Sequence, residues 1–341
     1  MRYANPGISH LRRLGFLTVT SVMLVSGAGH FGPAAAQWQP DKIVEIIVPT
    51  SPGGGLDRFG RFIQKVITEK GFIPNTTSVV NKAGGGGLIG FNYLNQFGGD
   101  GHYLIVHTPT LLTNHILGKG AINHRNVTPL AELYSEYVVI MVRADSPLKN
   151  GSDLVNALKN DATSMSIGIA TSLGNHNHSG VALPLKASGI NIRNLKTVIF
   201  NSVGDSTAAL LGGHIDIVPS PPGNMLALAR SGKLRGIAIS APMRIGEPFA
   251  NVPTWKELGS DVVFSTTRNV AGPRGLASDR ILFWDNVFER MVDTREWKEN
   301  LDEKLFSNTY TKSAKTASRL EEQYGELKEV LTELGLVKAK K

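Results

Sequence analysis

Two glycine-rich stretches carry the clearest chemical signal in the sequence. The first, residues 49–61, reads PTSPGGGLDRFGR and joins an apolar run rich in β-branched residues to a stretch whose apolar residues recur at helical spacing. Three consecutive glycines leave backbone N–H groups unshielded, and the helix that follows points its positive end at them, so the junction suits an anion. No Lys-Ser or Lys-Thr follows the glycines, which excludes the phosphate loop of an ATPase. We expect a carboxylate here, and a glycine turn with no ligand is the alternative.

The second stretch, residues 81–90, reads NKAGGGGLIG and follows a predicted strand. Gly85, Gly87 and Gly90 match the dinucleotide pattern G-x-G-x-x-G, but the acidic residue expected about twenty positions later is missing, so no cofactor is predicted. Two strand-to-helix loops close in sequence can converge at one edge of a parallel sheet, where ligands of open α/β folds bind. Thr108, which follows a third strand, either joins that edge or caps the next helix.

The elements that must position these loops alternate between strand and helix. Short apolar runs predict strands, and apolar residues three or four positions apart predict the helices between them. Strands are expected at residues 43–48, 77–80, 103–106, 137–142, 166–170, 195–200, 215–218 and 234–239, and long helices at residues 278–292 and 314–334. The pattern restarts near residue 166, so we predict an α/β fold with two lobes around a ligand cleft.

The composition limits the class of ligand. The 341 residues include 36 Lys and Arg and 28 Asp and Glu, and this mild basic excess is spread along the chain. It is far from the footprint of a nucleic-acid-binding protein and suits an acidic small molecule. The chain has no cysteine, so we expect neither disulfides nor the lipidated cysteine that tethers many exported receptors.

Residues 1–36 predict an export signal. They contain no acidic residue, an arginine pair at Arg12 and Arg13, an apolar stretch over residues 14–29 and a small-residue cleavage site at residues 34–36. The apolar stretch is short for a membrane span, so a membrane anchor is the weaker alternative. We expect a freely soluble periplasmic protein, and the choice between the general and the twin-arginine export route stays open.

Several short motifs follow one another along the rest of the chain. They are IVP at residues 47–49 with PGGG at 52–55, Asp57 and Arg61, Asn81 with Gly84, Gly86, Gly87 and Gly90, ADSP at 144–147, Gly174 with His178, LLGGHID at 210–216, GKLR at 232–235, VPT at 252–254 and ELG at 257–259. From about Trp38 to Leu336 the chain resembles the extracytoplasmic substrate-binding proteins of tripartite tricarboxylate transporters, the Bug receptor family. The segment at residues 268–276 resembles the tricarboxylate branch.

The resemblance implies a two-lobed periplasmic-binding-protein fold of the type II kind. Residues 37–141 and 262–341 would form the first lobe and residues 142–261 the second, joined by crossing strands that close on a carboxylated solute. The protein would be a monomeric receptor without cofactor or metal that delivers a di- or tricarboxylate, or a related organic acid, to membrane transporter subunits. A periplasmic ligand sensor is an alternative. An exported hydrolase is a weaker one, since no G-x-S-x-G or H-E-x-x-H motif occurs.

Carried over residue by residue, the resemblance assigns ligand contacts to both lobes. First-lobe contacts fall on Thr50, Ser51, Gly54, Gly86 and Gly87, and second-lobe contacts fall on Ser172, Asn175, His178 and Asp205. Thr50-Ser51 stands where the family usually has Phe-Ala, which implies a more polar entrance to the pocket. Ser202-Val203 replaces a usual Gly-Gly, so the second-lobe loop is expected to sit differently.

Four further side chains have both a ligand and a structural interpretation. Arg268 is the candidate for a second carboxylate because its guanidinium is planar and always charged, and a surface or interlobe salt bridge is an equal alternative. Asp57 and Arg61, one turn apart, are expected to support the first helix. The histidines near His178 lack an acidic or cysteine partner, so no metal site is predicted. We expect His178 to hydrogen-bond the ligand or the loop backbone, with a charge that makes affinity depend on pH.

Overall fold

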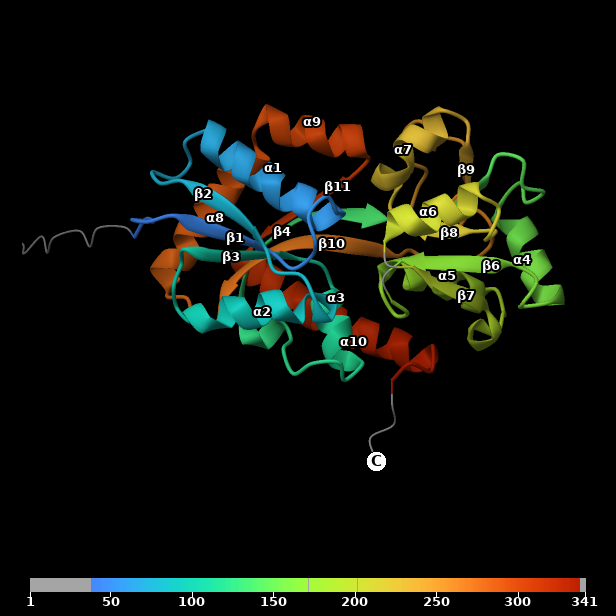
Figure 1. The fold of residues 1–341 in the computed structure, drawn as a ribbon, viewed down its shortest axis with the longest axis horizontal. Helices are drawn as coiled ribbons and strands as arrows, with labels where there is room; N and C mark the ends of the chain where they lie inside the picture. Colours follow the sequence, from blue (N-terminus) through green and yellow to red (C-terminus); the bar gives the residue numbers. More distant parts are fainter. Residues whose placement is uncertain (1–37, 171, 201, 338–341) are drawn as a thin grey trace, which may run out of the picture. The chain divides into compact units, whose positions relative to one another are not determined.

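The computed structural model describes residues 38–170, 172–200 and 202–337 (Figure 1). The predictions for residues 1–36, including the export signal, lie outside the described residues. Among the helices that the structure describes, none has the length and apolar character needed to cross a bilayer.

A six-stranded mixed sheet forms the first lobe. Its strands, in the order β11-β4-β10-β3-β1-β2, are β1 (Val44–Val48), β2 (Thr77–Asn81), β3 (Tyr103–His107), β4 (Val127–Tyr137), β10 (Ser265–Pro273) and β11 (Ser307–Lys312). β1 runs parallel to both β2 and β3, whereas β10 runs antiparallel to β3 and β4. The carboxyl ends of β1, β2 and β3 therefore meet at one edge, which confirms that the two glycine loops converge.

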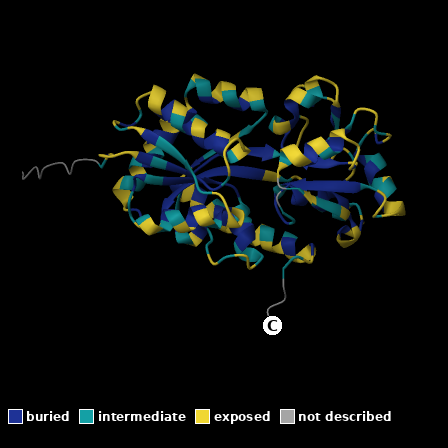
Figure 2. Cartoon of the chain, viewed as in Figure 1, coloured by how far each residue is buried: buried dark blue, intermediate teal, exposed yellow. Residues whose placement is uncertain are grey.

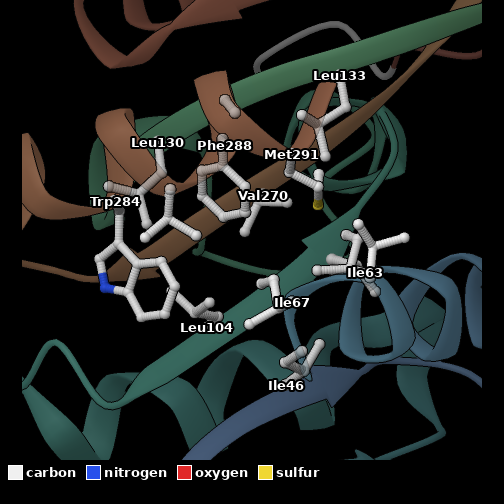
Figure 3. Packing of buried hydrophobic residues seen from close by; sticks show 14 of the residues in the cluster. Ile46, Ile63, Ile67, Leu104, Leu130, Leu133, Val270, Trp284, Phe288 and Met291 are labelled. Atoms are coloured by element: carbon white, nitrogen blue, oxygen red, sulfur yellow. The ribbon is translucent and has the colours of Figure 1, made fainter. Parts of the chain in front are cut away.

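Helices cover both faces of this sheet because its strands are apolar on both sides. One face carries α1 (Gly55–Glu69), α8 (Ser278–Val292) and α9 (Arg295–Lys304), and the other carries α2 (Leu88–Leu94), α3 (Thr110–Ile116) and the first half of α10 (Ser313–Glu333). Ile46 packs in the core under α1 and α8, and its neighbour Ile47 packs under α2. Figure 3 shows Ile63 and Ile67 of α1 and Phe288 of α8 in the first of these cores.

The second lobe contains a three-stranded and a two-stranded sheet. The first has the order β8-β5-β9, and the second pairs β6 and β7 in parallel; the strands are β5 (Val139–Arg143), β6 (Ser166–Ala170), β7 (Lys196–Phe200), β8 (Val218–Ser220) and β9 (Leu234–Ile239). The N–H of Gly168 donates to the carbonyl of Ile217 (2.9 Å), which joins β6 to the segment that enters β8. Helices α4 (Gly151–Asn160) and α5 (His176–Ala187) cover one face, and α6 (Val203–Leu211) and α7 (Pro222–Arg230) cover the other.

The chain crosses between the lobes at two adjacent points. Val138 alone separates β4 from β5, and Phe264 precedes β10, whose first residue pairs with Tyr137. Because β5 lies between β8 and β9, the predicted boundary after residue 141 falls inside a strand of the second lobe. We propose Val138 and Phe264 as the lobe boundaries.

Three strands of the first sheet were not predicted, namely most of β4, all of β10 and all of β11. All three are rich in polar residues, and β4 buries Glu132, Ser135 and Glu136. Polar side chains in a buried strand hide the apolar pattern from which strands are recognised, and they are tolerated only when partners satisfy them. Figure 2 shows how completely the central strands are covered by helices whose outer sides stay exposed.

The two glycine loops pack closely at Gly90, and this packing leads to a testable prediction. A Cβ on Gly90 would lie 2.9 Å from Pro49 Cβ and 3.3 Å from the carbonyl of Lys82, so Gly90→Ala should lower the free energy of unfolding by about 1 to 3 kcal/mol. The measurement is urea denaturation. In the control, Gly325→Ala in α10, the new methyl meets nothing within 4 Å and should stabilise by about 0.5 to 1 kcal/mol. Equal stability of the two variants would contradict the packing argument.

Candidate functional site

A buried carboxylate holds the first glycine loop in place. Asp57, only 3 % exposed, accepts hydrogen bonds from the N–H of Gly53 (2.8 Å), Nδ2 of Asn81 (2.9 Å) and Nε of Arg61 (3.0 Å). Burial by itself would raise the pKa of Asp57, but these hydrogen bonds outweigh it and lower that pKa, so the carboxylate stays ionised. The expected support of the first helix by Asp57 and Arg61 is confirmed.

Four successive glycines with positive φ shape the second loop. Gly84, Gly85, Gly86 and Gly87 have φ of 123°, 59°, 68° and 98°, a region that side chains with a Cβ rarely adopt. Nδ2 of Asn114 donates to the carbonyl of Gly86 (2.9 Å) and fixes the loop to α3. Gly87 is buried and its N–H donates to the carbonyl of Gly84 (2.9 Å), so a ligand contact at Gly87 is not supported.

Both loops present backbone amides without a protein acceptor. The N–H groups of Gly54, Gly55, Gly85 and Gly86 make no hydrogen bond to the described part of the chain, and all four glycines are exposed. Gly54 is the N-cap of α1, a helix of 15 residues whose N-terminus carries partial positive charge. Unpaired amides at such a terminus form an anion site. Gly55 and Gly85 were not among the predicted contacts.

Arg268 lies directly behind the first loop. Its Nη2 donates to Oε2 of Glu136 (2.7 Å) in a pair that is buried at the crossing of β10 and β4. The same Nη2 is 3.8 Å from the position that a Cβ on Gly55 would occupy. Arg268 therefore forms a salt bridge, but the pair is buried within the first-lobe sheet and lies neither at the surface nor between the lobes, where it was expected. The side chain stands next to the first loop. Its Nε and Nη1 are buried without a partner among the described residues.

Positive charge exceeds negative charge around this loop. Burial raises the pKa of Glu136, and the Arg268 and Arg58 guanidiniums oppose that rise. Arg58 projects from the first turn of α1, where Nη1 donates to the carbonyl of Gly53 (2.7 Å). With Asp57 and Arg61 included, three guanidiniums and a helix N-terminus face two carboxylates, so an anion would improve the local balance of charge.

The predicted second-lobe residues mainly organise their own loop. Asn175 caps α5, with Oδ1 accepting from the N–H of His178 (3.0 Å) and Nδ2 donating to the carbonyl of Ala170 (2.5 Å). Nδ1 of His178 accepts from the N–H of Gly174 (3.0 Å). The expected hydrogen bond of His178 to the loop backbone is therefore confirmed. Burial lowers the pKa of His178 to about 4, so the ring is neutral near pH 7 and its charge would affect affinity only at acidic pH. Ser172, between strand and cap, is half-buried.

The remaining predicted residues differ in exposure. Thr108 is buried and its Oγ1 accepts from the N–H of Thr110 (3.3 Å), which supports the local helix-start interpretation. Thr50 has a buried Oγ1 without a partner in the described chain, and Ser51 is exposed. Asp205 is exposed in the first turn of α6. Among the described residues no group of three His, Cys, Asp or Glu could hold a metal ion.

One hydrogen bond and one electrostatic interaction link the lobes beside the loops. Nη2 of Arg58 donates to Oδ1 of Asn224 (3.1 Å) on α7, so one guanidinium ties the first glycine loop to the second lobe. Burial and, secondly, the nearby Arg268 lower the pKa of His176 at the start of α5. A cavity of about 420 Å³ beside the crossing strands is lined by residues of both lobes, including Thr110, Asn175 and His176.

Sequence reasoning missed the residues that position the site. Glu136 lies in the unpredicted strand β4, and nothing in its local sequence marks it as the partner of Arg268. Asn114 and Arg58 project from the first turns of helices, where polar side chains are common, so their roles depend on contacts that only the folded chain shows.

Buried neutral histidines predict acid sensitivity. The ordinary pKa of 6.5 falls to about 4 for His178, so the unfolded chain binds a proton there at a higher pH than the folded chain. The free energy of unfolding must therefore fall as pH drops from 6.5 toward 4. His178→Asn keeps an acceptor for Gly174 but cannot titrate, and it should lose about 2 kcal/mol less than the wild type between about pH 7 and 5.

Chemical denaturation at the two pH values measures this difference. The comparison uses the change with pH within each protein, so any constant cost of the substitution cancels. An identical pH dependence in wild type and variant would show that His178 is not held neutral by the fold.

Comparison with known proteins gives the chain a family. The family described as "Tripartite tricarboxylate transporter family receptor" matches residues 61–336. Protein BugT of Bordetella pertussis is 25% identical over 260 residues, which cover 74% of this chain and 77% of BugT.

Solved structures share the fold. MatC from Rhodopseudomonas palustris with bound malate has a TM-score of 0.73 at 20% identity and covers 86% of this chain and 99% of its own. Rpa4515 of R. palustris with adipate has a TM-score of 0.77 at 19% identity and covers 87% and 98%. These likenesses confirm the predicted α/β fold with two lobes. The match over most of the described residues shows that the chain belongs to the receptor family of tripartite tricarboxylate transporters and is a solute-binding receptor rather than an enzyme.

Proposed function

We propose that this receptor captures a carboxylated small molecule in the periplasm and delivers it to the membrane subunits of a tripartite tricarboxylate-type transporter. The observation that carries the proposal is a set of exposed amides without an acceptor among the described residues, those of Gly54 and Gly55 at the N-terminus of α1 and those of Gly85 and Gly86 in the second glycine loop. A carboxylate oxygen accepts several N–H groups at once, and such charge-assisted hydrogen bonds are short and strong.

The class of acid follows from the charges behind the loop. Nε and Nη1 of Arg268 have no acceptor among the described residues, and a buried guanidinium gains free energy when its donors are paired. MatC and Rpa4515 are described with malate and adipate, which are both dicarboxylates. These observations support an organic acid with more than one carboxylate as the ligand of this chain, with one carboxylate on the glycine loops and Arg268 beside it.

Capture requires the lobes to close. The strands cross at two adjacent points, Val138 and Phe264, so a small change there would reorient the second lobe. Ser172, which follows β6, and Asp205, in the first turn of α6, would then reach the part of the ligand that projects from the first lobe. Moving a balance of open and closed forms from 1:99 to 99:1 takes about 5.5 kcal/mol of differential affinity, so second-lobe contacts must supply it.

The periplasmic location rests on residues 1–36 and on the family. The acid-free, arginine-paired and apolar start of the chain is typical of an export signal. A receptor that serves a transporter of the inner membrane must meet its solute on the outer side of that membrane. The absence of cysteine supports a receptor that diffuses freely rather than one tethered by a lipid.

Gly54→Val is the direct test of the glycine loops. Gly54 has φ of −76° and its nearest neighbour for a new Cβ is the carbonyl of Ser51 at 3.7 Å, so valine fits without strain while its methyl groups cover the amides. Affinity for malate or adipate, measured by isothermal titration calorimetry, should fall about 10- to 100-fold, since a lost hydrogen bond to a charged group costs about 1.5 to 3 kcal/mol.

Gly98→Val is the matched control. Gly98 is exposed, has φ of −47°, and a Cβ there would also meet its nearest neighbour, the carbonyl of Arg274, at 3.7 Å. It should bind as the wild type does. Gly86 is less suitable for substitution because its φ of 68° strains any side chain. Normal binding by Gly54→Val, or no acid bound by the wild type across a panel of organic acids, would refute the proposal.

The contribution of Arg268 needs a paired substitution. Arg268→Met alone leaves Glu136 buried and unpaired, and it should lower the free energy of unfolding by about 3 to 5 kcal/mol. The double variant Arg268→Met, Glu136→Gln removes both charges and should keep the stability of the wild type within about 1 to 2 kcal/mol.

Acid binding should nevertheless weaken in the double variant by about tenfold or more, because the ligand loses a charged donor. Thermal unfolding checks the stability and calorimetric titration checks the affinity. A stable double variant with unchanged affinity would leave Arg268 a purely structural role.

A further inference from the structure

Helix α10 connects the two lobes a third time. It starts on the first lobe, where the hydroxyl of Ser313 donates to Oδ2 of Asp285 (2.8 Å) and the N–H of Glu132 donates to Oγ1 of Thr316 (2.9 Å). It ends in the core of the second lobe, where Leu331 and Leu334 are buried in one cluster with α4 and α5 (Figure 1). The helix therefore has anchors on both sides of the hinge.

The end of α10 folds back on itself. Gly335 has φ of 69°, its N–H donates to the carbonyl of Thr332 (2.9 Å), and the N–H of Leu336 donates to the carbonyl of Leu331 (2.9 Å). This is the glycine-dependent Schellman end of a helix, in which the residue after the glycine packs beside the one five positions earlier. Leu336 is thereby brought next to Leu331.

This leucine pair presses against the second-lobe loop. A Cβ on Gly174 would lie 2.9 Å from Cδ2 of Leu331 and 3.4 Å from Cδ1 of Leu336, and Leu117 at the end of α3 adds a third contact at 3.2 Å. Gly174 has φ of 81° and its N–H donates to Nδ1 of His178, so the backbone is fixed from both sides at this point. Gly174 stands next to the cap residue Asn175 and two positions after Ser172.

We infer that Leu331 and Leu336 are positioning residues for the second-lobe ligand loop, residues 172–175. The contact holds this loop in the conformation in which it meets the ligand when the lobes close. Because α10 is also anchored on the first lobe, the position of the loop is coupled to the hinge. The role in ligand binding depends on the proposed function, whereas the control of the loop conformation does not.

Hydrogen exchange of the ligand-free protein tests the positioning step. Leu336 is only partly buried, so Leu336→Ala removes one of the leucine contacts with Gly174, leaves those of Leu331 and Leu117, and spares the core. The Gly174 amide should exchange about tenfold faster or more in this variant, because loss of packing favours local opening. Leu320→Ala is the control, since Leu320 is buried on the same helix at its first-lobe end. Its Gly174 amide should exchange as in the wild type.

Unchanged exchange at Gly174 in Leu336→Ala, or equally increased exchange in Leu320→Ala, would overturn the inference. Calorimetric titration with malate and adipate then tests the ligand role. Leu336→Ala should raise the dissociation constant at least about fivefold and Leu320→Ala should leave it unchanged. If exchange at Gly174 rises but the dissociation constant stays the same, the ligand role is overturned. If the wild type binds neither acid, the proposed function is at fault and the exchange result still decides the positioning step.

Discussion

The structure depends on keeping four glycine amides unpaired at a protein surface. Backbone N–H groups normally find an acceptor, and a loop that could relax would supply one. Here side chains hold the two loops in shape. Asp57 accepts hydrogen bonds from Gly53, Asn81 and Arg61, and Nδ2 of Asn114 donates to the carbonyl of Gly86, while the four amides find no acceptor among the described residues. The loops therefore point their remaining donors outward, and an anion is the partner that such donors lack.

The crossing strands set the charge behind those amides. β10 and β4 bury Arg268 and Glu136 as a pair, and the pair lies where the hinge, the edge of β3 and the first turn of α1 meet. Burying two charges is costly unless hydrogen bonds satisfy both, and two nitrogens of Arg268 remain unsatisfied among the described residues. In the proposed function, a bound acid would relieve the cost of this incomplete pairing at the lobe crossings.

The second lobe depends on a different kind of constraint. Its loop at residues 172–175 is shaped by the Asn175 cap, by the ring of His178 and by the leucines at the end of α10. Those leucines belong to a helix that begins on the first lobe, so the two lobes share packing as well as hinge strands. The loop geometry of one lobe is therefore set in part by the C-terminal segment of the chain.

The sequence by itself determined the α/β alternation, the convergence of two glycine loops and the family, because apolar periodicity and glycine runs are local properties. It located α8 and β9 within the bounds that the structure shows. Only the tertiary structure decided that Gly87 is buried, whereas the N–H of Gly85 has no acceptor among the described residues. It also decided that His178 stays neutral near pH 7 and that Arg268 pairs with Glu136, which lies 132 residues earlier in the sequence. These outcomes depend on which groups come into contact in the folded chain. Polar strands such as β4 and β11 are stabilised by the strands and side chains that pair with them, and their own sequence pattern does not mark them as strands.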